Sequence, residues 1–143
     1  MTVSVKRVYE KPSRRDGTRV LVDRLWPRGL SKQDAGVHQW LRDLAPSTEL
    51  RKWFHAHADQ WVKFRQRYLK ELAENQAAAA LATLYRLSNK GRLTLLFASR
   101  NEEHNNARVL KELMEGARKP PTGTGPAAAG SARIRKAARG PKR

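Results

Sequence analysis

One short segment of the chain crowds three bases and an acid around a tryptophan. Asp23 and Arg24 follow an apolar run, and Trp26 comes two residues later. Arg28 and Lys32 lie in the Pro- and Gly-containing stretch that follows. Arg and Lys bind phosphate and carboxylate groups through charge-assisted hydrogen bonds, and an indole can stack on a ligand ring. We interpret the segment as one wall of a site for an anionic ligand. The three bases and the tryptophan would bind that ligand.

A second polar segment follows another strongly apolar run, at residues 93–98. It contains Asn101, His104 and Asn105. Histidine titrates near neutral pH, so His104 is the best candidate for moving a proton, with Asp23 to orient a base or a ligand hydroxyl. The two asparagines are candidate ligand-binding residues. Asp23 and His104 are therefore the candidate catalytic pair, although the sequence names no reaction and does not decide between binding and catalysis.

Each of these residues also has a purely structural interpretation. Asp23 can form an ion-pair network with Arg24 and Arg28 that fixes the loop, because a guanidinium suits a protein carboxylate as well as a ligand carboxylate. Trp26 can close the edge of the core. His104 and its neighbours can cap a helix or pack against one. The sequence leaves both interpretations open.

The sequence gives no indication of a metal site or a cofactor site. The chain has no cysteine, and His38 is isolated. His55 and His57 are two positions apart, which places them on different sides of a helix. The HExxH, GxGxxG, GxSxG and P-loop motifs are absent. We therefore expect neither a metal ion nor a bound cofactor.

Hydrophobic periodicity predicts the elements that position these residues. Short apolar runs predict three strands, at residues 3–9, 19–24 and 93–98. Apolar side chains at steps of three and four predict helices at residues 37–44, 48–55, 61–72, 75–87 and 102–115. Ser47, Asp59 and Asn75 are placed to start three of these helices. Because strands that alternate with helices favour parallel pairing, we expect an α/β fold: a single small three-layer-type domain with a short, mostly parallel sheet flanked by helices.

Both polar segments leave predicted strands at their carboxyl ends. In open α/β sheets, ligands bind beyond these ends. If the second and third predicted strands are parallel neighbours, six side chains converge on one pocket: Asp23, Arg24, Arg28, Asn101, His104 and Asn105. Backbone N–H groups at the start of the last helix would favour an anion in that pocket.

Basic residues dominate the chain and are concentrated toward one end. The formal net charge is +17, and from Gly116 onward there are eight Lys or Arg residues but no Asp or Glu. Residues 120–132 are mostly Pro, Gly, Ala and Thr, which bury too little apolar surface to offset the entropy of folding. We expect a folded domain over residues 1–116 and a disordered basic tail over residues 117–143. Such a tail suits non-specific, salt-sensitive binding to nucleic acid.

The remaining patterns concern location and partners. No apolar run approaches the roughly 18 residues of a membrane span, and the first residues do not form a secretory signal. We expect a cytoplasmic protein without a membrane partner, and the sequence leaves its oligomeric state open. Three functions also stay open: an enzyme or binding protein for an anionic, phosphate- or nucleotide-like molecule, a nucleic-acid-associated protein, and a structural or interaction protein that presents Trp53 and Trp61 to a partner.

Several stretches resemble one known bacterial family. They are Arg7-Val8-Tyr9, VLVDRLWPRGLSK at residues 20–32, WLRDLAPSTELRKWF at 40–54, residues 64–72, and LLFASRNEEHNNA at 95–107. On these motifs the chain is similar to domain-of-unknown-function family 488, in its YeaO-like group. The resemblance implies a compact bacterial α/β domain and brings no established activity. It also implies that Asn101 stands where the family usually has an Asp, so a chemistry that depends on that acid would be lost here.

Overall fold

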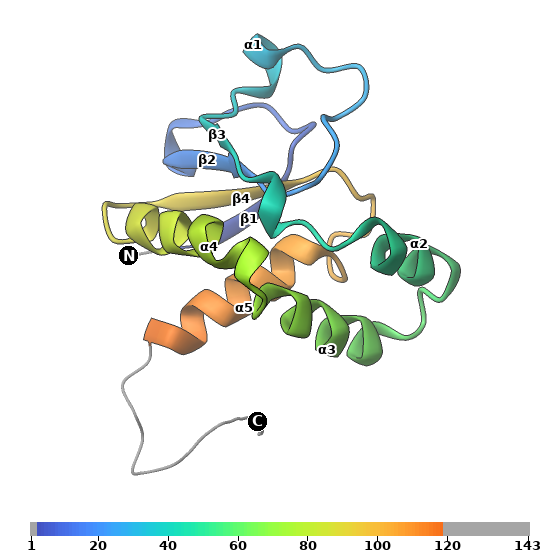
Figure 1. Cartoon of the computed structure of the whole chain (residues 1–143). Coiled ribbons are helices and arrows are strands. Elements are labelled where there is room, and N and C mark those ends of the chain that lie inside the picture. Colours follow the sequence, from blue (N-terminus) through green and yellow to red (C-terminus); the bar gives the residue numbers. More distant parts are fainter. Residues whose placement is uncertain (1–2, 119–143) are drawn as a thin grey trace.

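The computed structural model describes residues 3–118, in which four parallel strands form one sheet (Figure 1). The strands are β1 (Val3–Arg7), β2 (Thr18–Leu21), β3 (Gln39–Trp40) and β4 (Leu93–Phe97). Their order across the sheet is β1-β4-β2-β3, and each neighbouring pair is parallel. From residue 119 onward, the predicted basic tail lies outside the described residues. The fold is α/β with a parallel sheet, as predicted.

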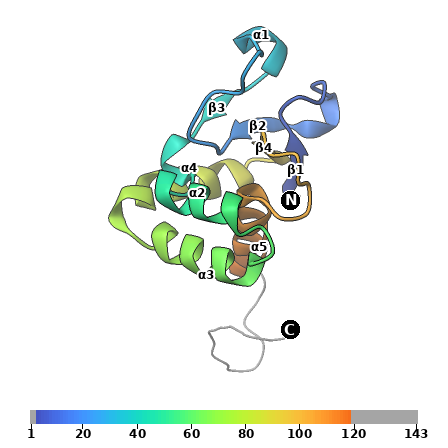
Figure 2. The ribbon, with the colours of Figure 1, turned by 90° about the vertical axis from the view of Figure 1, so that its right-hand side faces the viewer.

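Five helices and two 3₁₀ turns accompany the sheet in the described part of the chain. They are α1 (Lys32–Ala35), α2 (Thr48–Ala56), α3 (Trp61–Leu72), α4 (Asn75–Ser88), α5 (Asn106–Arg118), η1 (Arg14–Asp16) and η2 (Arg42–Leu44). Helices α4 and α5 cover one face of the sheet, with α3 beyond them, and α1 lies on the opposite side (Figures 1 and 2). Within residues 3–118, no helix is long and apolar enough to cross a membrane.

The sheet buries side chains on both of its faces. On one face, Leu95 and Phe97 belong to a core cluster with Tyr68 of α3. On the other face, Leu96 packs in a second cluster with Leu21. Strands that are buried on both faces are apolar at almost every position, which explains the continuous apolar run of β4.

The register places the ends of β2 and β4 side by side. Leu21 lies opposite Leu96. The backbone N–H of Val22 still donates to the carbonyl of Leu96 at 3.2 Å. The segments that follow, which begin at Val22 and Ala98, therefore leave the sheet at the same edge. The prediction that the second and third predicted strands are parallel neighbours is confirmed.

The predicted starts of three helices are partly confirmed. Ser47 caps α2 as predicted, because its hydroxyl accepts the N–H of Leu50 at 3.1 Å. Asn75 is the first residue of α4, also as predicted. The predicted cap at Asp59 is wrong. Gln60 holds the cap position of α3 and makes no side-chain cap hydrogen bond.

The predicted helix at residues 37–44 is wrong. Gln39–Trp40 instead forms the edge strand β3, in which Trp40 lies opposite Leu21 of β2. The N–H of Leu41 continues this pairing to the carbonyl of Leu21 at 2.9 Å, and η2 follows. Pairing with a strand that is distant in the sequence has overridden a local helical spacing. The short helix α1 was not predicted, although the hydroxyl of Ser31 caps it.

Candidate functional site

Asp23 joins the ends of the two neighbouring strands β2 and β4. One carboxylate oxygen, Oδ2, accepts the backbone N–H of Ala98 at 2.8 Å. The other, Oδ1, accepts a hydrogen bond from Nδ2 of Asn106 at 3.0 Å. Ala98 directly follows β4 and Asn106 begins α5. The carboxylate therefore lies where the two strands and the last helix meet.

Asn106 is the second member of this junction. Its side chain is buried, and Nδ2 also donates to the carbonyl of Val22 at 2.9 Å. One carboxamide thus holds both the backbone of the β2 end and the carboxylate beside it. On the far side of Asp23, the indole Nε1 of Trp40 donates to the Asp23 carbonyl at 2.7 Å. Three hydrogen bonds, from Ala98, Asn106 and Trp40, fix the position of this aspartate.

Tyr68 forms the floor of the junction. Its side chain is fully buried in α3, and its hydroxyl donates to the carbonyl of Leu44. Burial raises the pKa of Tyr68 well above its ordinary value, and the nearby charges of Asp23 and Glu71 raise it further. The phenol therefore stays protonated across the physiological range and acts as a neutral polar group beside the carboxylate.

Burial also raises the pKa of Asp23 above its ordinary value. The hydrogen bonds from Ala98 and Asn106 and the positive charge of Arg51 oppose this effect without cancelling it. The side chain is nevertheless partly exposed. Carboxyl groups whose pKa is shifted by burial and by specific partners cluster at functional sites, which makes Asp23 a candidate functional group.

Arg24, the residue after Asp23 in the chain, carries an unsatisfied donor. Its Nε is buried and has no hydrogen-bond partner among residues 3–118. One terminal nitrogen lies 3.5 Å from the carbonyl of Pro46, which is the long limit for a hydrogen bond. Buried donors in native proteins are almost always paired. The N–H at Nε of Arg24 has no acceptor among the described residues, which makes it a candidate for binding a ligand.

The loop after β2 holds the other predicted residues of this segment through its backbone. The indole N–H of Trp26 donates to the carbonyl of Leu30 at 2.7 Å, and its ring packs edge-on against Trp40 at 5.4 Å. The hydroxyl of Tyr9 donates to the carbonyl of Arg28 at 2.9 Å. The side chains of Arg28 and Lys32 are exposed. Trp26 thus packs at the edge of the core, which is the structural alternative to stacking on a ligand.

The loop after β4 is organised by two asparagines. Oδ1 of Asn101 accepts the backbone N–H groups of Glu103 and His104, at 3.0 and 2.9 Å. Asn105 donates to the carbonyl of Asn101 at 2.9 Å, and its Oδ1 accepts the N–H of Arg108 at the same distance. Asn105 therefore caps α5. This explains why the helix begins at residue 106 rather than at the predicted residue 102.

The ring of His104 packs on an aromatic residue of another helix. It stacks on Trp61 of α3 with a centroid distance of 4.6 Å and an angle of 11° between the planes. Neither ring nitrogen forms a hydrogen bond with a residue of the described chain. The imidazole is partly buried, and one of its faces is covered by the indole. His104 is thus placed by packing, and its backbone by Asn101.

The structure brings together some of the predicted site residues and separates others. Asp23 and the loop after β4 meet through the N–H of Ala98. Among the described residues, no hydrogen bond or ion pair joins the side chains of Arg28 or Lys32 to Asp23 or His104. Two surface hollows of the described chain are lined by other residues and by none of the eight predicted ones.

Sequence reasoning missed three residues of the junction. Tyr68 belongs to an amphipathic stripe that predicts only a core helix. Asn106 ends the polar segment, but nothing in the sequence distinguishes it from Asn105. Arg51 lies in the exposed part of α2, and its charge acts on Asp23 across the fold. Within residues 3–118, no group of three His, Cys, Asp or Glu side chains is placed to hold a metal ion.

Comparison with known proteins identifies close relatives. The model of the family described as the inactive DUF488-N3 subclade matches residues 2–131. The uncharacterized protein YeaO of Escherichia coli (strain K12) is 42% identical over 112 residues, which cover 78% of this chain and 96% of that protein. The uncharacterized protein Rv3073c of Mycobacterium tuberculosis (strain H37Rv) is 43% identical over 114 residues, which cover 80% of this chain and 94% of that protein. No solved structure matches the chain.

Proposed function

Since this chain belongs to the inactive N3 subclade of the DUF488 family, we propose that it binds an anionic, phosphate-bearing ligand without converting it. The ligand would lie at the carboxyl edge of the sheet, where β2 and β4 end next to each other. This is the position at which open parallel sheets bind their ligands. The observation that carries the proposal is the buried Nε of Arg24, which has no partner among the described residues.

A ligand oxyanion would supply the acceptor that this guanidinium lacks. Hydrogen bonds between a guanidinium and a phosphate are charge-assisted and directional. Arg28 and Lys32, exposed in the same loop, add positive charge that attracts an anion to this edge. The Asp23 carboxylate, fixed by its hydrogen bonds, would accept a hydroxyl of the ligand and so define its orientation.

Two features favour binding over turnover. The family resemblance implies an acid at the position of Asn101, and the Asn101 side chain is engaged with the backbone of its own loop. The imidazole of His104 is stacked on Trp61. The amide of Asn101 cannot transfer a proton, and among the described residues no hydrogen bond joins the imidazole of His104 to Asp23. The description of the subclade as inactive agrees with a protein that has kept the fold and lost a reaction.

Thermal unfolding with a panel of nucleotides, sugar phosphates and inorganic phosphate tests this proposal. We expect at least one phosphate-bearing compound to raise the melting temperature of the wild-type protein in a concentration-dependent way. Arg24→Gln should lose this response, and Arg28→Ala should weaken it. Arg86→Gln removes the same charge from the exposed side of α4 and should respond like the wild type. Equal responses of all four proteins would contradict the proposal.

The basic tail supports a second candidate function, association with nucleic acid. From Gly116 onward the chain has eight bases and no acids, so the observation lies in the sequence itself. Phosphate contacts of this type weaken steeply as salt increases. In the full-length protein, replacing the four bases Arg133, Arg135, Lys136 and Arg139 by Gln should flatten the salt dependence of binding to a duplex. An unchanged slope would assign binding to the folded domain.

The third candidate function, an interaction surface around Trp53 and Trp61, has less support. Both indoles are only partly exposed. Trp53 stacks on His57 at 4.9 Å, with the guanidinium of Arg67 4.3 Å from its ring. Trp61 stacks on His104. Their ring faces are therefore engaged within the chain rather than presented to a partner.

A further inference from the structure

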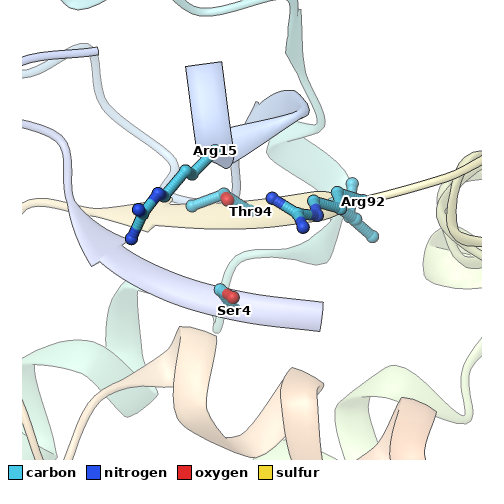
Figure 3. A pocket seen from close by; sticks show the side chains of 5 residues that line it. Ser4, Arg15, Arg92 and Thr94 are labelled. Carbon is cyan, nitrogen blue, oxygen red and sulfur yellow. The ribbon is translucent and has the colours of Figure 1, made fainter. Parts of the chain in front are cut away.

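A hollow of about 220 Å³ lies on the sheet at the opposite end of β4 from Asp23. Ser4 of β1 and Thr94 of β4 form its floor, and they lie directly opposite each other in the strand pair. Arg15 of η1 and Arg92, which precedes β4, form its walls. Figure 3 shows both arginine side chains extended over the strands, with Thr94 between them. Two guanidinium groups and a serine hydroxyl thus line one small space.

The backbone that carries the two arginines is held rigidly. The hydroxyl of Thr94 donates to the carbonyl of Asp16 at 2.7 Å, and the N–H of Thr18 donates to the carbonyl of Arg92 at 3.0 Å. Ser13 and Asp16 form a reciprocal capping box around η1. The turn that bears Arg15 is therefore attached at two points to the segment that bears Arg92, so the fold fixes the spacing of the two backbone segments.

The acid of this turn, Asp16, is already paired with two cations. Asp16 accepts hydrogen bonds from Lys6 at 3.1 Å, from Arg19 at 2.6 Å and from the N–H of Ser13 at 3.0 Å. Burial alone would raise the pKa of Asp16, but these partners outweigh it and lower the pKa. Arg15 and Arg92 make no ion pair and no side-chain hydrogen bond with another residue of the described chain. The hollow therefore carries an uncompensated positive charge.

We propose that this hollow is a phosphate-binding site, separate from the site at the carboxyl edge. Two guanidinium groups can each donate a pair of hydrogen bonds to the oxygens of one phosphate, and the Ser4 hydroxyl adds a further donor. Pockets for whole drug-sized ligands have volumes of about 300–1,000 Å³. The smaller volume here suits inorganic phosphate or the phosphate group of a small ester, with the rest of the ester in solvent.

The site does not depend on Arg24 or Asp23, since it lies at the amino ends of β1 and β4. A five-residue strand separates the two locations, a length of roughly 15 Å at the usual rise per residue. The two proposals can therefore fail or succeed independently, and the same set of variants distinguishes them.

Calorimetric titration of the full-length protein with inorganic phosphate and with glycerol 3-phosphate tests the site. We expect saturable binding that weakens at least about tenfold in the double variant Arg15→Gln/Arg92→Gln, because each lost hydrogen bond to a charged group costs that much or more. Arg14→Gln, in the same turn but outside the hollow, should bind like the wild type. A phosphate signal that is unchanged in the double Gln variant and lost in Arg24→Gln would belong to the carboxyl edge and would overturn the proposal for the hollow. Tighter binding of inorganic phosphate or of glycerol 3-phosphate shows whether the hollow prefers free phosphate or a phosphate ester.

A further variant keeps the charge and removes the fork-shaped donors. Arg15→Lys/Arg92→Lys should fall between the wild type and the double Gln variant, since an ammonium cannot form the paired hydrogen bonds. Both arginines are exposed, so circular dichroism should show that all variants fold. The proposal is overturned if the wild type shows no saturable binding, or if the double Gln variant binds as tightly as Arg14→Gln.

Discussion

The carboxylate of Asp23 and the carboxamide of Asn106 are 83 positions apart in the sequence and are joined by a hydrogen bond of 3.0 Å. Through this contact the end of β2 and the start of α5 share one polar junction. The backbone of Ala98 completes it from β4. Side chains that serve three elements at once are sensitive positions, and they give the first prediction.

Asn106→Ala should destabilise the protein. The change removes the donor to Asp23 and to the carbonyl of Val22, and both acceptors are then left without this partner. Leaving buried polar groups unpaired costs about 1–3 kcal/mol. Urea denaturation measures the change in the free energy of unfolding. Asn75→Ala, at the exposed start of α4, is the control and should cost far less. Equal losses for both variants would argue against a central role for the junction.

The ionisation of Asp23 should oppose folding. Its pKa is raised in the folded protein because burial disfavours the charged form. The folded state therefore holds the proton more tightly than the unfolded chain. The stabilising contribution is fully present below the unfolded pKa and is lost as the pH rises through the folded pKa. Carbon NMR of the side-chain carboxyls should give Asp23 a higher midpoint than Asp16. The reverse order would contradict this assignment.

Asp16→Ala should be among the most damaging single changes, at about 3–5 kcal/mol near neutral pH. The substitution leaves the buried guanidinium of Arg19 without its carboxylate partner. Because the pKa of Asp16 is lowered in the folded state, its contribution is present above the unfolded pKa and is lost as the pH falls through the folded pKa. The penalty should therefore shrink in acid, as denaturation at two pH values would reveal.

A matched control for this change is Glu112→Ala. Glu112 pairs with Arg65 at 2.8 Å, but both side chains are about two-fifths exposed. Exposed ion pairs contribute only about 0–1 kcal/mol. If Glu112→Ala lowered the free energy of unfolding as much as Asp16→Ala, burial would not explain the importance of the pair between Asp16 and Arg19.

Gly17→Ala should distort the wall of the phosphate hollow. Gly17 has φ of +65°, and an added Cβ would lie 2.3 Å from the carbonyl oxygen of Arg92. Alanine at a positive φ destabilises by more than about 1 kcal/mol, and the clash adds to this cost. Gly29→Ala is the control, because Gly29 has φ of +80° but open space around it. Thermal unfolding should rank Gly17→Ala as clearly the more damaging, and the opposite ranking would contradict the clash.

Features encoded in a few consecutive residues were predictable from the sequence. The apolar run of β4 and the Ser47 cap depend on local patterns, and both are confirmed. The edge strand β3 was missed because its pairing with Leu21 is a tertiary contact that no local spacing reports. The same reason applies to the candidate sites. Asp23 stood out by composition, whereas Arg15 and Arg92, 77 positions apart, acquire a shared role only when the turn docks on the sheet.

The order of the strands has a consequence for how the protein is made. In the described chain β1 and β2 do not pair with each other, because β4 lies between them and pairs with both. During synthesis on the ribosome, β1 emerges long before β4 and remains unpaired until β4 is available. The sheet can close only after residues 93–97 have left the exit tunnel, so this late, apolar stretch governs when the nascent chain commits to its native topology.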